Sequence, residues 1–259
     1  ETQQASTFLH EYIHFLQDIM TPKGLQNIYI IGEYLRLVTK TVKENDYKVS
    51  RPIIPRFQGY NVGNNWKVSY YTQGEIDNKA QNYITLKKDL SKQIIDDVTG
   101  QKIDIGRIII SCKCSDGSIK DYCFGTIQIM EGMAKMIQDS VYPPSRRRSP
   151  YNPYYISIDL ANDIMPGLGN NNLAMIAIFD YALQSTNPGW AFVNYIEEKK
   201  LQGYNATTLS HDIVYNDMAS AVVQSHTLGV TTLKSGYEDM MKQAQGVFND
   251  YVGGVWIFK

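Results

Sequence analysis

Two histidines stand four positions apart inside an apolar stretch, and this spacing constrains the fold more than any other feature. The stretch from Thr7 to Gln17 is T-F-L-H-E-Y-I-H-F-L-Q. The pattern predicts a helix over residues 5–20. Residues i and i+4 share a helix face, so His10 and His14 would lie one turn apart. Apolar residues surround this helix, which predicts that it is buried on most sides.

The H-E-x-x-H arrangement predicts a zinc site. Two imidazoles on one helix face can bind one Zn²⁺ at about 2.0–2.1 Å. Glu11 follows the first histidine, and from the edge of that face it can act as general base on a water that zinc activates. Asp18 lies eight residues from His10, or about 12 Å along the helix. It cannot join both histidines on one ion, but it can orient His14 from the second shell.

A third ligand must come from elsewhere in the chain. Glu131 is the best candidate, because it lies within a predicted helix over residues 126–140 and has apolar neighbours. An acidic residue in such a stretch needs a partner, and a metal ion supplies one. The alternative is that Glu131 faces solvent. His211 and His226 are rival ligands, and either would make a three-histidine site.

The segments His10-Glu-Tyr-Ile-His14 and Glu131-Gly-Met-Ala134 resemble the gluzincin group of zinc metallopeptidases, the thermolysin-like superfamily. The resemblance implies Zn²⁺ as cofactor, His10, His14 and Glu131 as ligands, and Glu11 as general base. It also implies a zincin-like fold. A later stretch, Phe179–Phe192, is similar to a segment of uncharacterised bacterial H-E-x-x-H proteins.

Peptide hydrolysis also needs a donor that stabilises a tetrahedral oxyanion. The candidates are Tyr154, Tyr155, His211 and His226, and the sequence does not choose among them. His226 is as readily explained as a hydrogen-bonded core residue. The hairpin before the Glu131 helix could bind an extended peptide along its edge, or it could be purely structural.

The strongest β-signal is Asp116-Gly117 between two strand-like runs, 102–114 and 119–124. A two-residue turn there would place Cys114 opposite Ile119. One face of the hairpin would then carry Ile110, Cys112, Cys114, Ile119, Asp121 and Cys123. The three cysteines could bind a soft metal, but buried free thiols acting as small hydrophobic groups fit better, since no fourth ligand has suitable spacing.

The remaining segments favour a mainly α fold of the α+β class. Helices are predicted over 25–43 and 75–97, with an irregular connection over 44–74. A basic, proline-flanked loop at 143–153 separates a catalytic part, 1–142, from a helical C-terminal part, 143–259; a single domain is the alternative. Further helices are predicted over residues 154–164, 171–184, 188–201, 209–227 and 235–250.

Composition narrows the function classes. With 43% hydrophobic and 20% charged residues, the 259-residue chain can form a packed core. A formal net charge of −1 gives no reason to expect nucleic acid as a partner. No apolar run is long enough for a membrane span, and no signal-like pattern opens the chain.

These features together predict a zinc peptidase that acts on a peptide or protein substrate. Three cysteines are too few for a disulfide framework, which favours a reducing, cytoplasmic location. The first alternative is a zincin-like interaction or regulatory module without peptidase activity, although the intact Glu11 argues against it. The second is a helical binding protein without a metal.

Overall fold

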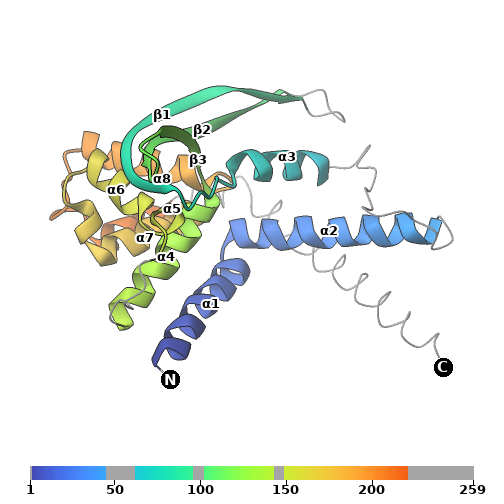
Figure 1. Ribbon diagram of the computed structural model, residues 1–259, viewed down its shortest axis with the longest axis horizontal. Helices are drawn as coiled ribbons and strands as arrows, with labels where there is room; N and C mark the ends of the chain where they lie inside the picture. Colours follow the sequence, from blue (N-terminus) through green and yellow to red (C-terminus); the bar gives the residue numbers. More distant parts are fainter. Residues whose placement is uncertain (1, 45–61, 96–101, 143–148, 221–259) are drawn as a thin grey trace.

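The computed structural model describes residues 2–44, 62–95, 102–142 and 149–220 (Figure 1). Within the described residues, helices predominate and accompany one small antiparallel sheet, as the sequence predicts. The sheet has the strand order β1-β2-β3. The elements are α1 (Thr2–Met20), α2 (Pro22–Glu44), α3 (Val62–Thr72), β1 (Ala80–Ile95), β2 (Lys102–Cys114), β3 (Ile119–Phe124), α4 (Thr126–Val141), α5 (Tyr151–Tyr154), α6 (Ile156–Ile164), the 3-10 helix η1 (Leu168–Asn170), α7 (Asn172–Leu183) and α8 (Pro188–Leu201).

The main hydrophobic core lies between the sheet and the helices α4, α6, α7 and α8. Figure 1 shows β1 and β2 arching over α6 and α8. Ile108 and Ile110 of β2 pack in one cluster with Ile129 of α4, Ile156 of α6 and Phe192 of α8. This cluster therefore takes residues from both sides of the undescribed segment 143–148. No helix within the described ranges is both long and apolar enough to cross a bilayer.

Residues 80–95 form a strand, so the helix predicted over 75–97 is wrong. Ala80, Tyr83 and Leu86 pair with Cys114, Cys112 and Ile110 of β2. The spacing is three on β1 but two on β2, because the register shifts between Ala80 and Asn82 and again between Tyr83 and Thr85. Each shift inserts one extra residue, and the resulting three-residue spacing of inward side chains imitates a helical pattern.

The hairpin between β2 and β3 forms as predicted, but its register is one residue away from the predicted one. Cys114 N donates to Ser118 O, which closes a three-residue loop, and Gly117 has φ +81°. A loop of this kind ends in a left-handed residue, which glycine adopts without strain. Ile119 therefore pairs with Lys113 rather than with Cys114.

This register separates the cysteines between the two faces of the hairpin. Cys112 lies opposite Lys120, whereas Cys123 lies opposite Ile109. All three thiols are free and buried, and Cys112 and Cys114 belong to the main core. They therefore act as small hydrophobic groups.

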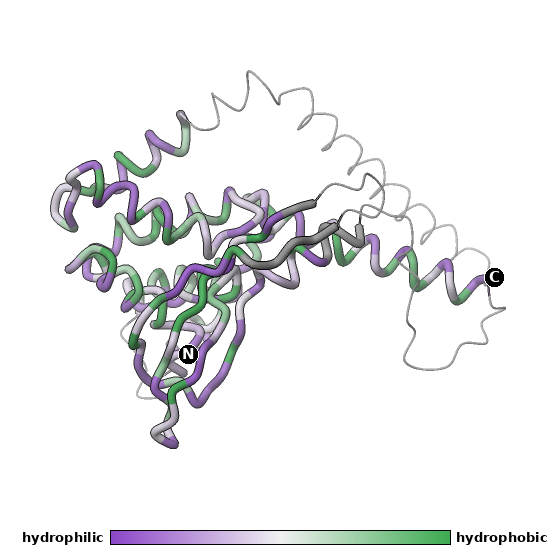
Figure 2. Tube along the Cα trace, turned by 90° about the horizontal axis from the view of Figure 1, so that it is seen from above, coloured by the Kyte–Doolittle hydropathy of each residue, from purple (hydrophilic) through white to green (hydrophobic). Residues whose placement is uncertain are grey.

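Helix α1 is not buried on most sides. One face carries His10 and Gln17, which are buried, while Phe8 is 70% and Phe15 is 54% exposed. The prediction was wrong because, among the described elements, α1 makes its main contacts with α2 and α4 alone, so the rest of its surface stays exposed. Helix α2 then projects from the helical body, and hydrophobic and hydrophilic residues alternate along it (Figures 1 and 2).

Two further predictions need correction or lie outside the described part. The connection predicted to be irregular over 44–74 contains α3. The last predicted helices are only partly described: residues 211–220 are helical, and 235–250 fall outside the described residues.

Candidate metal centre

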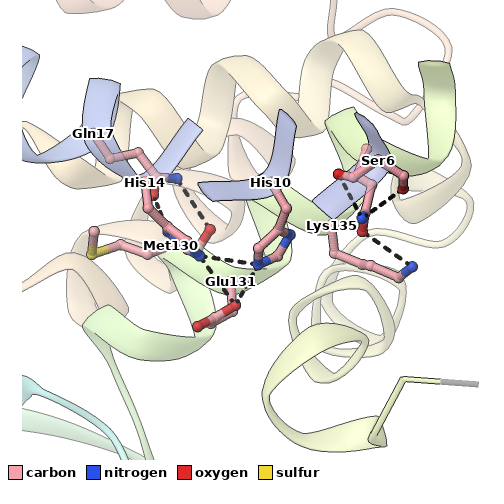
Figure 3. A network of polar contacts seen from close by, with 8 residues as sticks. Ser6, His10, His14, Gln17, Met130, Glu131 and Lys135 are labelled. Atoms are coloured by element: carbon pink, nitrogen blue, oxygen red, sulfur yellow. Dashed lines mark hydrogen bonds and ion pairs between the residues drawn. The ribbon is translucent and has the colours of Figure 1, made fainter. Parts of the chain in front are cut away.

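Helices α1 and α4 lie side by side and antiparallel, and their facing surfaces form the candidate site. At one end, Gln138 Nε2 donates to Ser6 Oγ at 2.8 Å and to Ser6 O at 3.0 Å. Further along, Gln17 Nε2 donates to Met130 O at 3.1 Å (Figure 3). The residues between these two tethers, His10 and His14 on one helix and Glu131 on the other, therefore face one another.

A glycine holds the other side of α4 close to the body of the protein. A Cβ at Gly132 would lie 2.5 Å from Ser157 Oγ and 3.3 Å from the ring of Phe179. A residue without a side chain allows this approach without moving these neighbours, so Gly132 lets α4 lie close against α6 and α7. The depth of α4 in turn sets the position of Glu131.

Three potential ligand atoms converge between the helices. His10 Nε2 lies 3.1 Å from His14 Nε2 and 3.1 Å from Glu131 Oε2. The third separation, from His14 Nε2 to Glu131 Oε2, is 3.3 Å. Ligand atoms of a tetrahedral zinc site with bonds of 2.0–2.1 Å lie roughly 3.3 Å apart. The three atoms thus have the spacing of one face of a coordination tetrahedron.

Gln17 fixes the tautomer of His14. Gln17 Nε2 donates a hydrogen bond to Met130 O, which leaves Gln17 Oε1 as the acceptor that faces His14. His14 Nδ1 lies 2.8 Å from that oxygen and therefore carries the proton. In neutral His14, the lone pair is then on Nε2, directed toward Glu131 and His10. An outer hydrogen bond of this kind is typical of metal-binding histidines.

The charges of the triad stabilise one another. Burial raises the pKa of Glu131, yet hydrogen bonds from His10 and His14 and their charges outweigh burial and lower the pKa to about 2. Burial lowers the pKa of His14, but hydrogen bonds to Glu131 and Gln17 raise it above 6.5. The carboxylate is therefore ionised at neutral pH, which a cation requires.

The ring of Tyr154 lies against His10, one of the three potential ligands. The two ring centroids lie 5.9 Å apart in an edge-on arrangement. Burial and the negative charges of Glu131 and Glu11 raise the pKa of Tyr154, so its hydroxyl keeps its proton and can donate. His10 Nδ1 is buried and has no hydrogen-bond partner among the described residues.

A pocket of about 290 Å³ opens over the triad. Glu11 and Tyr154 line it together with the three potential ligands. Lys135 also lines it, and Asp139 Oδ1 accepts a hydrogen bond from its ammonium group at 2.7 Å. The pocket thus combines an exposed carboxylate, a phenol and a paired ammonium group beside the ligand atoms.

The other predicted site residues lie elsewhere. Tyr155 does not line the pocket, and it stands at the junction of α5 and α6. His211 faces Asp212 at 3.4 Å and lies outside the pocket. His226 falls outside the described residues. Asp18 lies one turn beyond His14, but Gln17 occupies the hydrogen-bonding position on His14 Nδ1 that was expected for Asp18.

The hairpin does not contribute to the pocket over the triad. None of its lining residues comes from β1, β2 or β3. The outer edge of β3 is also partly paired, since Glu75 N donates to Cys123 O at 2.9 Å. This arrangement favours the structural interpretation of the hairpin.

Among the residues described, His10, His14 and Glu131 are the group of potential metal ligands that the fold assembles. In comparisons with known proteins, no family model, no curated protein and no solved structure matches the chain. The function must therefore be argued from the site itself.

Proposed function

We propose that this protein is a zinc-dependent peptidase of the gluzincin type. The observation that carries the proposal is the convergence of His10 Nε2, His14 Nε2 and Glu131 Oε2 at separations of 3.1–3.3 Å. Two imidazoles and one carboxylate suit Zn²⁺, and three protein ligands leave a fourth position open for chemistry.

Each residue of the pocket then has a role. His10, His14 and Glu131 would hold the ion, which lowers the pKa of a water molecule and polarises a carbonyl group. Glu11 accepts the proton of the attacking water and passes it to the leaving amine. Tyr154 keeps its proton, so its hydroxyl can donate to the oxyanion that forms at the substrate carbonyl.

The buried, free thiols of the hairpin support a reducing, cytoplasmic compartment for this activity. The alternative function is a zincin-like interaction module that binds zinc without hydrolysis. Glu11 discriminates between the two, because a purely structural zinc site needs no general base. Its exposed position on the pocket lining supports the catalytic proposal.

The Glu11→Gln substitution tests the proposal. The variant should retain one zinc ion per chain by elemental analysis and lose hydrolysis of a fluorescent casein substrate by at least about 100-fold. Glu198→Gln, an exposed change on α8, serves as the matched control and should leave both unchanged. Full activity in Glu11→Gln, or absence of zinc from the wild-type protein, would reject the proposal.

A further inference from the structure

A second pocket lies beyond the candidate metal centre along α1 and α4. On α1, Thr7, Glu11 and His14 line the pocket over the triad, and Asp18 follows one turn later on the same stripe. On α4, Ile127 lies one turn before Glu131. Asp18 and Ile127 both line a second pocket of about 330 Å³. The two pockets therefore follow one another along the same pair of helices.

A buried lysine lies in the second pocket. Lys23 is only 1% exposed, although its side chain is among those lining the pocket. Its ammonium group donates to Gln26 Oε1 at 3.1 Å, and to Ser69 Oγ and Thr186 O at 3.4 Å. All three acceptors are neutral. No carboxylate of the described residues lies within ion-pair distance of Lys23, so its charge is not compensated there.

A buried charge without a counter-ion is costly, and an anionic ligand would remove this cost. Two features of the pocket add to the attraction. Lys23 lies in the first turn of α2, where the helix dipole favours a negative charge. Asn27 and Ser69 line the pocket as further polar groups. The apolar part of the lining comes from Ile30, Ile31, Ile127 and Met130.

We infer that the Lys23 pocket binds the free C-terminal carboxylate of a peptide substrate, with an aliphatic side chain against the isoleucines. The inference rests on the proposed peptidase function. Asp18 lies about 6 Å beyond His14 along α1, which is about two residues of extended chain. The scissile bond would therefore lie about two or more residues before the C-terminus, and the enzyme would release short C-terminal peptides.

Asp18 is the one acidic group among the described residues that line the pocket. Burial raises the pKa of its carboxyl group, and the charge of His14 opposes this effect. Its position between the metal centre and Lys23 suits it to accept a backbone N–H of the bound peptide. The Asp18→Asn variant should therefore still prefer a carboxylate over an amide.

Two peptides that differ only at their end test the inference. Both are fluorescein-labelled Ala-Ala-Phe-Ala-Leu, one with a free C-terminal carboxylate and one with a C-terminal amide. Fluorescence anisotropy on the full-length, zinc-loaded Glu11→Gln variant measures binding without turnover. The carboxylate form should bind about tenfold or more tightly. Equal binding of the two forms would overturn the inference on a protein whose pocket is intact.

Variants then locate the preference. Lys23→Met should abolish the difference between the two peptides, whereas Lys113→Met, at an exposed position on β2, should preserve it. Ile31→Trp should weaken binding of the carboxylate form by filling the pocket mouth, and it keeps Lys23. A preference that survives both pocket variants would place the carboxylate elsewhere and reject the inference.

The two proposals fail in different ways. Tight, carboxylate-dependent binding without hydrolysis by the wild-type protein would reject the peptidase proposal and leave the Lys23 pocket assigned. Hydrolysis of both peptides at equal kcat/KM would support the peptidase proposal and reject the assignment of the pocket.

Discussion

The Nε2 atoms of His10 and His14 lie 3.1 Å apart, and Glu131 Oε2 lies within 3.3 Å of both. Gln17 places the proton of His14 on Nδ1, so Nε2 has a lone pair when the ring is neutral. Two imidazole nitrogens at this separation need a proton or a cation between them. The arrangement therefore fits the metal site that we propose, and without a metal ion it would hold a shared proton.

Removal of the carboxylate ligand should weaken zinc binding. Loss of a residue that hydrogen-bonds to a metal ligand reduces metal affinity roughly 10–100-fold. We expect Glu131→Ala to reduce zinc affinity by more than this, because a direct ligand and a compensating charge both disappear. Competition with a chromophoric chelator measures the affinity. Glu197→Gln on α8 controls for the loss of one negative charge, and unchanged affinity in Glu131→Ala would exclude this residue as a ligand.

Gln17 should affect zinc affinity through its hydrogen bond to His14, without binding the metal itself. In Gln17→Leu the Nδ1 proton of His14 loses its acceptor and Met130 O loses its donor. We expect zinc affinity to fall about 10–100-fold while the ion remains bound at saturation. Gln4→Leu, at an exposed position on the same helix, is the control. An affinity equal to wild type would show that Gln17 does not orient His14.

The stability of the metal-free protein should depend on pH through the triad. His14 has a pKa raised above 6.5, so its contribution is complete below pH 6.5 and is lost as pH rises through the raised value. Glu131 has a pKa lowered from 4.5 to about 2, so its contribution is complete above pH 4.5 and is lost as pH falls from there toward 2.

Zinc should reverse the pH dependence of stability near neutral pH. His14 must lose its proton to bind the ion, so zinc binding becomes stronger as pH rises. Tm measured from pH 5 to 8 with and without zinc gives both trends. The stabilisation by zinc should grow across this range in the wild-type protein and should be much smaller in His14→Gln. A zinc effect that does not change with pH would contradict the assignment of His14 as a ligand.

The convergence of His10, His14 and Glu131 could be predicted from the sequence because it depends mostly on local patterns. The i, i+4 histidines fix each other's direction on one helix, and Glu131 is an acidic residue within an apolar helix pattern. The contribution of Gln17 could not be predicted, since it depends on where Met130 lies on another helix. The exposure of Phe8 and Phe15 likewise depends on which elements pack against α1.

Strand β1 shows a different limit of sequence analysis. Its inward side chains at Ala80, Tyr83 and Leu86 have helical spacing because two register shifts interrupt the ladder. A shift becomes visible only when the partner strand is known, as the two-residue spacing on β2 demonstrates. The Lys23 pocket was missed for a similar reason, since its walls come from α1, α2, α3 and α4.

Close packing at Gly132 should be required for stability and for the site. In Gly132→Ala the new methyl group would lie 2.5 Å from Ser157 Oγ and 3.3 Å from the ring of Phe179, so these side chains or helix α4 itself must shift. We expect a loss of about 1–3 kcal/mol in the free energy of unfolding, measured with urea. Zinc affinity should fall as well, since Glu131 moves with α4. Gly32→Ala, where no neighbour lies within 4 Å, should not destabilise the protein.

Lys23 should give the protein a second pH dependence, in the alkaline range. Burial lowers its pKa from 10.5 to about 8, so the unfolded chain binds more protons between these values and stability rises with pH across this window. Urea unfolding from pH 7.5 to 10 measures the slope. Lys23→Met should remove this contribution, while Lys113→Met should keep it.

A bound carboxylate should restore the proton to Lys23, because an adjacent negative charge raises the pKa of the ammonium group. Binding of the carboxylate peptide at pH 9 should therefore take up a proton, and binding of the amide peptide should not. Calorimetry in two buffers of different ionisation enthalpy measures this uptake, with the Glu11→Gln variant preventing turnover. Equal uptake for the two peptides would show that the carboxylate does not lie beside Lys23.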